Sequence, residues 1–295
     1  MSHRSGFVGL LGRPSVGKST LLNRLVGRKV AITSRRAQTT RNVLRGILTR
    51  PEGQIVFVDT PGLHVPHHRL GELMIKAAEG AAADVDVLLL VIDASKPLGP
   101  GDELAFAAAA RVKAPAVLVA NKVDLAADRG EAAVAEALRR GEFAGGCRVS
   151  AVTGQGVEEL VARVFALLPE GPAFYPPEMV TDQEERFLVA ETIREKALEV
   201  LREEVPHALA VDVELLREEE GKDLVHVAAT LYVEKESQKG IVIGRGGQML
   251  KAIGSAARYD LERHFGRQVH LELWVKVRED WRNSLRDLRE FGYEE

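Results

Sequence analysis

One eight-residue segment, Gly12-Arg-Pro-Ser-Val-Gly-Lys-Ser19, restricts the folds open to this chain more than any other. It matches the pattern G-x-x-x-x-G-K-[ST] and lies between an aliphatic run at residues 7–11 and a helical pattern at residues 19–26. In that setting, backbone N–H groups of the loop surround a phosphate, and the start of the helix adds positive potential. The segment therefore predicts a nucleotide-binding α/β domain.

The remainder of residues 5–169 continues the same alternation of short aliphatic runs and helical patterns. Strands are expected at residues 7–11, 43–49, 55–59, 87–92, 116–120 and 147–149. Helices are expected at residues 19–26, 71–83, 102–112, 130–140 and 157–168. This order predicts a mostly parallel sheet with helices on both faces.

A cluster of prolines then interrupts regular structure, and residues 170–181 are expected to form a linker. The prolines at and around it are Pro169, Pro172, Pro176 and Pro177. Residues 182–295 follow a different order: a helix at 183–203, strands at 208–216 and 223–234, helices on both sides of Gly244–Gly247, a strand at 268–277 and a helical segment at 280–290. We therefore expect a second, α+β domain.

Three further segments fall at the ends of expected strands, where open α/β sheets bind ligands. In Asp59-Thr60-Pro61-Gly62, the carboxylate can hold Mg²⁺ through water and the glycine can bond the γ-phosphate of a nucleotide. In Asn121-Lys122-Val-Asp124, the last carboxylate can accept from both N1–H and the N2 amino group of guanine, a pair of donors that adenine lacks. Ser150-Ala151 offers a backbone N–H to the guanine carbonyl. The nucleotide is therefore expected to be GTP.

The expected nucleotide site includes the whole phosphate loop and these three segments. Its residues are Gly12, Arg13, Pro14, Ser15, Val16, Gly17, Lys18, Ser19, Thr20, Asp59, Thr60, Pro61, Gly62, Asn121, Lys122, Asp124, Ser150 and Ala151. Mg²⁺ is expected at Ser19, Asp59 and a threonine from Gln38-Thr39-Thr40-Arg41, where Thr40 is favoured over Thr39. Lys18, Thr40, Asp59 and Gly62 are the expected catalytic residues.

The second domain carries Gly244-Arg245-Gly246-Gly247, a G-x-x-G sequence between two helical patterns. Alone, such a pair of glycines is weak evidence in a chain with 27 glycines. Its position, after a helix, two strands and a helix and before a helix and a strand, is that of a type II KH domain, which clamps about four unpaired nucleotides. RNA contacts are expected at Lys239, Gly244, Arg245, Gly246, Gly247 and Lys251.

Taken together, these segments resemble the Era family of ribosome-assembly GTPases, and the resemblance covers nearly the whole chain. It implies a GTPase that binds 16S ribosomal RNA near its 3′ end during assembly of the 30S subunit. It also implies a cytoplasmic monomer with some peripheral association with the membrane. A tRNA-modification GTPase is a rival, but the C-terminal cysteine typical of that class is absent, since Cys147 is the chain's single cysteine. The other alternative is a switch whose KH domain binds protein or membrane instead of RNA.

Two residues depart from related GTPases. Leu63 stands where Ras-type enzymes place a glutamine that orients the attacking water, so slow intrinsic hydrolysis is expected. Ser15 stands where relatives carry an asparagine that, in some of them, binds a potassium ion in place of an arginine finger. The serine weakens the case for potassium as a cofactor.

The charge and aromatic residues of the chain add two observations. The net charge of −3 is unusual for a nucleic-acid binder, but residues 235–258 carry five positive side chains against Glu236 alone, so contacts with phosphate are expected to be local. Trp274 falls on the polar side of its expected strand. Stacking on a base is one interpretation, but packing under the final helix with Trp281 is the favoured one.

Overall fold

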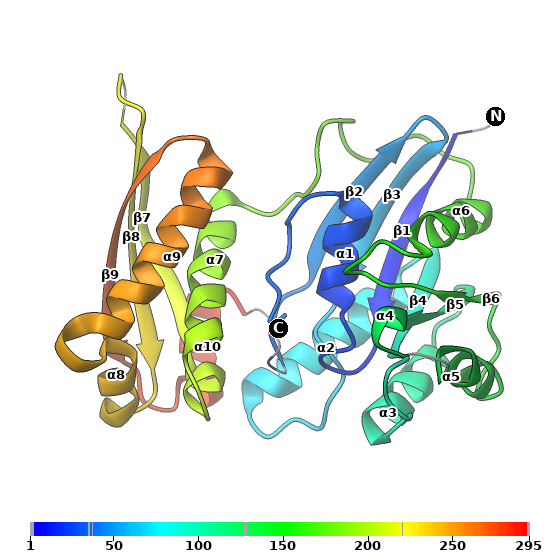
Figure 1. The fold of residues 1–295 in the computed structure, drawn as a ribbon, viewed down its shortest axis with the longest axis horizontal. Helices are drawn as coiled ribbons and strands as arrows, with labels where there is room; N and C mark the ends of the chain where they lie inside the picture. Colours follow the sequence, from blue (N-terminus) through cyan, green and yellow to red (C-terminus); the bar gives the residue numbers. More distant parts are fainter. Residues whose placement is uncertain (1–2, 35, 37, 127–128, 220, 294–295) are drawn as a thin grey trace. The chain divides into compact units, whose positions relative to one another are not determined.

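The computed structural model describes residues 3–34, 36, 38–126, 129–219 and 221–293 (Figure 1). The chain divides into two compact units, one of residues up to 67 and 71–182, the other of residues 68–70 and 183 onward. Within the described residues, no helix is both long and apolar enough to cross a bilayer.

The first unit is built on a six-stranded sheet in the order β2-β3-β1-β4-β5-β6. Its strands are β1 (Arg4–Leu11), β2 (Leu44–Arg50), β3 (Gly53–Asp59), β4 (Val87–Asp93), β5 (Ala116–Asn121) and β6 (Gly145–Arg148). Only the β2–β3 pair is antiparallel, and every other pair is parallel. All residues of β3 and β4 are buried, as expected for central strands covered on both faces.

Helices cover this sheet on both faces (Figure 1). They are α1 (Lys18–Val26), α2 (Arg69–Ala83), α3 (Pro100–Ala109), α4 (Val123–Ala126), α5 (Arg129–Leu138) and α6 (Val157–Leu167). Residues of α2, α3 and α5 bury a shared core with Leu88, Leu90 and Ile92 of β4. Because successive strand residues face opposite sides, Leu89 and Val91 are buried on the other face. The expected mostly parallel α/β architecture is confirmed.

The proline-rich segment after α6 packs against the first unit. The buried side-chain oxygen of Gln54 accepts hydrogen bonds from the backbone N–H groups of Phe174 (2.8 Å) and Tyr175 (2.9 Å). At the open edge of β2, the Ile47 N–H donates to the Val180 carbonyl at 2.9 Å. Arg45 pairs with Asp182 at 2.9 Å. The residues that lead into the second unit are therefore bonded to β2 and β3.

The second unit is a three-stranded sheet in the order β7-β8-β9 with helices on one face. Its elements are α7 (Glu185–Val200), β7 (Ala210–Glu218), β8 (Leu224–Val233), α8 (Glu236–Ile243), α9 (Gln248–Phe265), β9 (Gln268–Val277) and α10 (Leu285–Glu290). Short 3₁₀ turns lie at Val205–Ala208, Arg245–Gly247 and Trp281–Asn283. Strand β7 is antiparallel and β9 parallel to β8, as the expected α-β-β-α-α-β order requires.

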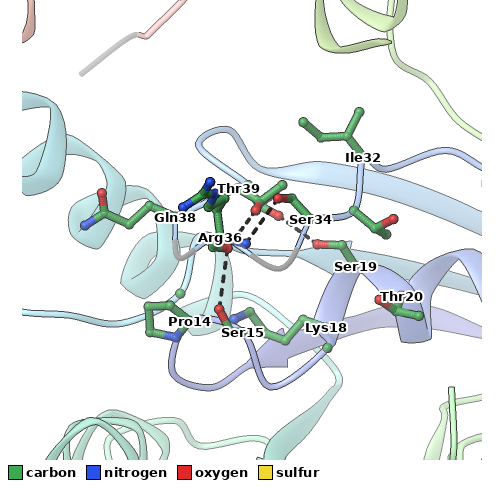
Figure 2. A pocket seen from close by; sticks show the side chains of 14 residues that line it. Pro14, Ser15, Lys18, Ser19, Thr20, Ile32, Ser34, Arg36, Gln38 and Thr39 are labelled. Carbon is green, nitrogen blue, oxygen red and sulfur yellow. Dashed lines mark hydrogen bonds between the residues drawn. The ribbon is translucent and has the colours of Figure 1, made fainter. Parts of the chain in front are cut away.

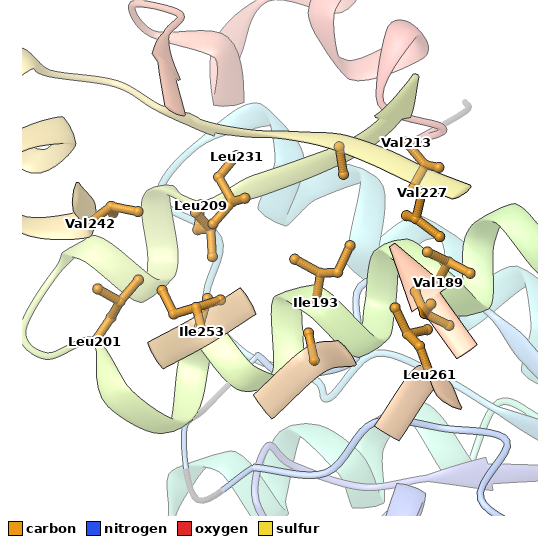
Figure 3. Close-up of a cluster of buried hydrophobic side chains, with 14 of the residues drawn as sticks. Val189, Ile193, Leu201, Leu209, Val213, Val227, Leu231, Val242, Ile253 and Leu261 are labelled. Atoms are coloured by element: carbon orange, nitrogen blue, oxygen red, sulfur yellow. The ribbon is translucent and has the colours of Figure 1, made fainter. Parts of the chain in front are cut away.

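Apolar side chains from α7, α9 and the inner face of the sheet form the core of this unit (Figure 3). Ile193 of α7, Ile253 of α9 and Leu231 of β8 are all fully buried in it. The favoured prediction for Trp274 is wrong, because its side chain is 44% exposed on the outer face of β9. Trp281 alone is buried, where its indole N–H donates to the Ala208 carbonyl at 2.9 Å and its ring meets Phe291.

Candidate active site and nucleic-acid interface

The phosphate loop is closed around its own lysine. Lys18 is 6% exposed, and its ammonium donates to the carbonyls of Gly12 at 3.0 Å and Arg13 at 3.2 Å. Gly17 has φ 97°, and a Cβ there would lie 2.4 Å from Asn121 Nδ2, so only glycine fits. Burial lowers the pKa of Lys18 to about 8, although the nearby Asp59 carboxylate partly opposes this shift.

Three oxygen-bearing side chains, those of Ser19, Thr40 and Asp59, converge beside the loop. Ser19 and Thr40 also line a pocket together with Pro14, Thr20 and Thr39 (Figure 2). Ser19 Oγ donates to Asp59 Oδ2 at 2.6 Å and lies 2.7 Å from Thr40 Oγ1. Among the described residues, Asp59 Oδ1 is buried without a hydrogen-bond partner. Burial raises the pKa of Asp59 above its ordinary value, against the attraction of Lys18.

The two candidate threonines lie in different surroundings. Thr40 Oγ1 reaches Ser19 and lies 3.5 Å from Asp59 Oδ2, whereas Thr39 Oγ1 donates to the Arg36 carbonyl at 2.9 Å. The structure therefore brings Thr40 to the convergent group, which is the arrangement that the sequence favoured.

The segment after β3 packs directly against the phosphate loop. Thr60 Oγ1 donates to the Leu10 carbonyl at 2.7 Å, and the Leu63 N–H donates to Gly12 at 3.2 Å. A Cβ at Gly62 would lie 2.7 Å from Pro14 Cα, so the close approach of the two segments requires glycine. Pro61 between them is buried. The Leu63 side chain is 4% exposed and belongs to the core, not to the pocket.

Asn121 ties the expected base-binding segments together. Its Nδ2 donates to the Val16 carbonyl at 2.9 Å, and its Oδ1 accepts from the N–H groups of Lys122 at 2.8 Å and Ala151 at 3.0 Å. Ser150, fully buried, accepts from the Thr153 N–H at 3.1 Å. The backbone N–H expected to face guanine is thus already bonded to Asn121.

Asp124 contrasts with these buried groups. It is exposed, and its carboxylate forms no hydrogen bond or ion pair with any described residue. The carboxylate is therefore available to an external donor pair.

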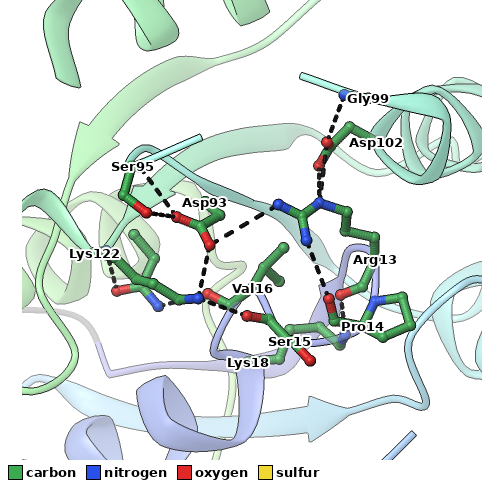
Figure 4. A network of polar contacts seen from close by, with 11 residues as sticks. Arg13, Pro14, Ser15, Val16, Lys18, Asp93, Ser95, Gly99, Asp102 and Lys122 are labelled. Atoms are coloured by element: carbon green, nitrogen blue, oxygen red, sulfur yellow. Dashed lines mark hydrogen bonds and ion pairs between the residues drawn. The ribbon is translucent and has the colours of Figure 1, made fainter. Parts of the chain in front are cut away.

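A charged network supports the loop from behind (Figure 4). Lys122 Nζ donates to the Ser15 carbonyl and to Asp93, both at 2.7 Å. Arg13 pairs with Asp102 at 3.0 Å, and its guanidinium lies 3.9 Å from Asp93. Burial favours a higher pKa for Asp93, but hydrogen bonds from Lys122 and Ser95 outweigh it and lower that pKa. The network therefore holds Arg13 and Ser15, in the first half of the loop, against side chains at the ends of β4 and β5 and the start of α3.

Ser15 occupies a strained position in the loop. Its φ is 64°, a left-handed conformation rare for a non-glycine residue, and its Oγ donates to the Arg36 carbonyl at 3.4 Å. The side chain thus contacts the segment that carries Thr40.

The G-x-x-G loop of the second unit joins α8 to α9. Gly244, Gly246 and Gly247 all have positive φ values, 73°, 57° and 79°. A Cβ at Gly244 would lie 2.7 Å from Met249 Cβ, whereas Cβ atoms at the other two glycines would meet open space. Those two glycines therefore leave the backbone open to a ligand.

A groove beside this loop runs between α9 and β9. It is lined by Gly247, Leu250, Lys251, Gly254, Ser255, Arg258, Leu271 and Leu273. Arg245 and Lys251 are exposed and without ion pairs in the described part of the chain, but Lys239 lies 3.7 Å from Glu236. The sequence prediction missed Arg258 and the two β9 leucines. Alternation along β9 placed these leucines in the core, which they line only in part.

Comparisons with known proteins find relatives of both units. Residues 7–122 match the family described as 50S ribosome-binding GTPase, and residues 204–282 match the KH domain family. The chain is 50% identical to GTPase Era of Carboxydothermus hydrogenoformans over 100% of its length and 99% of the relative's. It is 49% identical to GTPase Era of Caldanaerobacter subterraneus subsp. tengcongensis over 99% of both chains.

Two solved structures match nearly the whole chain at 38% identity. One is Era in complex with MgGDPNP and nucleotides 1506–1542 of 16S ribosomal RNA, with a TM-score of 0.96 over 99% of this chain and 100% of that one. The other is a point variant of Aquifex aeolicus Era bound to GDP·AlF₄⁻, with a TM-score of 0.95 over the same shares.

Proposed function

The chain belongs to the Era family of GTPases, and from that premise we propose that it is a GTP-driven switch for RNA. It binds 16S ribosomal RNA near the 3′ end through its KH unit and acts in assembly of the 30S subunit. The observation that carries this proposal is that one chain joins a GTPase site to an open G-x-x-G groove. A 38% identical Era with both units has been solved with a GTP analogue and that RNA.

The nucleotide site is proposed to use its residues in distinct roles. Backbone N–H groups of residues 12–20, other than Pro14, surround the phosphates, and Lys18 leaves the loop carbonyls to contact the β- and γ-phosphates. Gly62, held against Pro14, places its N–H at the γ-phosphate. Asp124 binds the N1–H and N2 groups of guanine. Its lack of partners in the described structure supports this role.

The convergent oxygens fit a magnesium ion. Mg²⁺ prefers oxygen ligands and is bound through one or two carboxylates or hydroxyls together with substrate phosphates. Ser19 and Thr40 supply the hydroxyls, and the partnerless Asp59 Oδ1 supplies a buried carboxylate oxygen. When bound, the ion neutralises charge that develops on the phosphates.

Intrinsic hydrolysis is proposed to be slow. The Leu63 side chain is buried in the core, so it cannot orient the attacking water. Thr40 senses the γ-phosphate, and the segment that contains it becomes ordered or released with nucleotide state.

The RNA strand is proposed to follow the groove between α9 and β9. The open backbone at Gly246 and Gly247 accepts phosphate, together with Arg245, Lys239 and Lys251. Leu271 and Leu273 offer an apolar floor for bases in the same groove.

Coupling between the two sites is proposed to pass through β2. This strand begins at Leu44, four residues after Thr40, and its edge bonds the segment that leads to the second unit. Besides the Ile47–Val180 bond, Thr181 Oγ1 donates to the Arg45 carbonyl at 2.7 Å, and Arg45 pairs with Asp182. A structural change at Thr40 is therefore transmitted through β2 and its bonded neighbours, residues 180–182, to the start of the KH unit.

Crosslinking of the full chain to RNA in cells, followed by sequencing, tests the RNA assignment. The proposal expects reads concentrated at the 3′ end of 16S RNA, with loss of those reads when Arg245 and Gly246 are replaced. Reads spread evenly over cellular RNA would instead favour the alternative, a GTP switch whose KH unit binds protein or membrane.

From its family we also propose that the protein is a cytoplasmic monomer with some peripheral association with the membrane. Potassium is not expected to accelerate hydrolysis, because Ser15 replaces the asparagine that binds it in some relatives. Equal GTP turnover in potassium and sodium chloride is the expected result, and faster turnover in potassium would contradict it.

A further inference from the structure

Arg24, on the helix that follows the phosphate loop, reaches the loop expected to bind the guanine base. Its Nε donates to the Ala151 carbonyl at 2.9 Å, and its Nη2 donates to the carbonyl of Val152. One side chain thus bonds two consecutive backbone carbonyls that lie more than 120 residues further along the chain. Hydrogen bonds from a charged donor are about twice as strong as neutral ones.

The 150–156 loop is otherwise closed on itself. The Gly154 N–H donates to the Ser150 carbonyl at 2.8 Å, and the Ser150 N–H donates to the Gln155 carbonyl at 2.9 Å. In the described structure, two side chains from outside the loop reach the backbone of residues 150–152: Asn121, which accepts from the Ala151 N–H, and Arg24. These two contacts set the orientation of the loop relative to Asp124.

The bond to the Ala151 carbonyl also fixes a donor. The Ala151 carbonyl and the Val152 N–H belong to one planar peptide unit and point in opposite directions. Holding the oxygen therefore holds the direction of the N–H, and withdrawal of electron density by the guanidinium makes that N–H a better donor. The guanine carbonyl at C6 is the acceptor that such a donor serves.

We propose that Arg24 is a positioning residue for guanine recognition, which orients the Val152 N–H toward the C6 oxygen of the base. The inference rests on the proposed guanine site. It assigns specificity for the C6 carbonyl to a residue outside the nucleotide-binding segments, whereas Asp124 serves N1–H and N2.

The test compares binding of GDP with binding of 6-thio-GDP to the full chain. The thio analogue retains the diphosphate, N1–H and N2 but carries sulfur, a weak acceptor, at C6. Arg24→Ala should lower the preference for GDP over 6-thio-GDP by about three- to tenfold, with little change in the affinity for the analogue. Arg24→Lys should restore part of the preference, since its ammonium can reach one carbonyl. Arg111→Ala, which removes an exposed arginine 3.9 Å from Glu79, is the matched control and should leave the preference unchanged.

An equal loss of affinity for both nucleotides in Arg24→Ala, or no loss for either, would overturn the inference. Because the result is a ratio measured on one protein sample, partial unfolding lowers both affinities together and does not imitate a change in preference. Failure of the guanine assignment itself has a different signature. In that case the unmodified protein would bind GDP and XDP equally well.

Discussion

The nucleotide site and the RNA groove are built on opposite physical plans. In the first, three functional side chains are buried and already bonded, since Lys18, Asp59 and Asn121 are 6%, 0% and 1% exposed. Asp124 is the exposed exception. In the second, Arg245, Lys251 and Arg258 are exposed around an open glycine backbone. Buried polar groups discriminate sharply because a wrong ligand leaves them unpaired. Exposed charges around phosphate add up and are screened by salt.

The largest expected effect is a change of base. Asp124→Asn places an amide where guanine offers N1–H, and the amide instead matches the C2 carbonyl of xanthine. The ratio of GTP affinity to XTP affinity should fall by about 10⁴-fold, the discrimination typical of sites that hydrogen-bond the N–H groups of their ligand. Calorimetric titration of both nucleotides measures the change. Unchanged GTP affinity would remove the guanine assignment.

The next effect concerns the G-x-x-G loop. Replacing Arg245 and Gly246 together by Asp places negative charge and two side chains against RNA phosphate. The affinity for single-stranded 16S RNA should fall by about 10²- to 10³-fold at physiological salt. GTP turnover without RNA should stay near normal, which serves as the control for folding. Tight RNA binding by this double variant would show that the groove is not the RNA site.

A smaller effect is expected from the pH of the solution. With the pKa of Lys18 near 8 in the nucleotide-free protein, the ammonium is largely charged at neutral pH and loses its proton above that value. Bound phosphates favour the charged form, so nucleotide binding takes up a proton in alkaline solution. GDP affinity should be flat up to about pH 8 and then fall by up to tenfold per pH unit. Calorimetry in two buffers of different ionisation enthalpy measures the proton uptake, and its absence would contradict the assignment.

The smallest expected effect tests whether the exposed charges of the groove contribute additively to RNA binding. Lys251→Ala removes one exposed charge without breaking an ion pair in the described structure. It should weaken RNA binding only several-fold, by the same factor for every RNA sequence. It should also reduce the slope of log affinity against log salt concentration by about one. Lys222→Ala is the control, because Lys222 is exposed, pairs locally with Glu219 and does not line the groove. A sequence-dependent loss would show that Lys251 reads bases.

The sequence predicted the framework closely where patterns were strong. The alternation at residues 268–277 gave the bounds of β9 without error, and the phosphate loop placed β1 and α1 within three residues. β6 begins at Gly145 instead of residue 147, because glycines carry no side chain to signal a strand. The structure places Thr40, and not Thr39, beside Ser19, a contact that the sequence could not supply.

What could not be predicted depends on contacts between distant segments. Arg24 appears in the sequence as an ordinary helix residue, and only the fold brings it to Ala151. Arg258 is likewise one of several arginines until α9 places it on the groove. Trp274 was misjudged because a tryptophan is usually buried, and nothing local indicates that this one stays 44% exposed.

Control of RNA binding by GTP can be tested by one comparison of affinities. The affinity of the full chain for the 3′ segment of 16S RNA is measured with GDP and with a non-hydrolysable GTP analogue, at one salt concentration. Coupling through β2 predicts a difference of about 5- to 150-fold, matched by the same factor in the effect of RNA on analogue binding. Equal RNA affinities in the two nucleotide states would contradict the account and leave two independent sites on one chain.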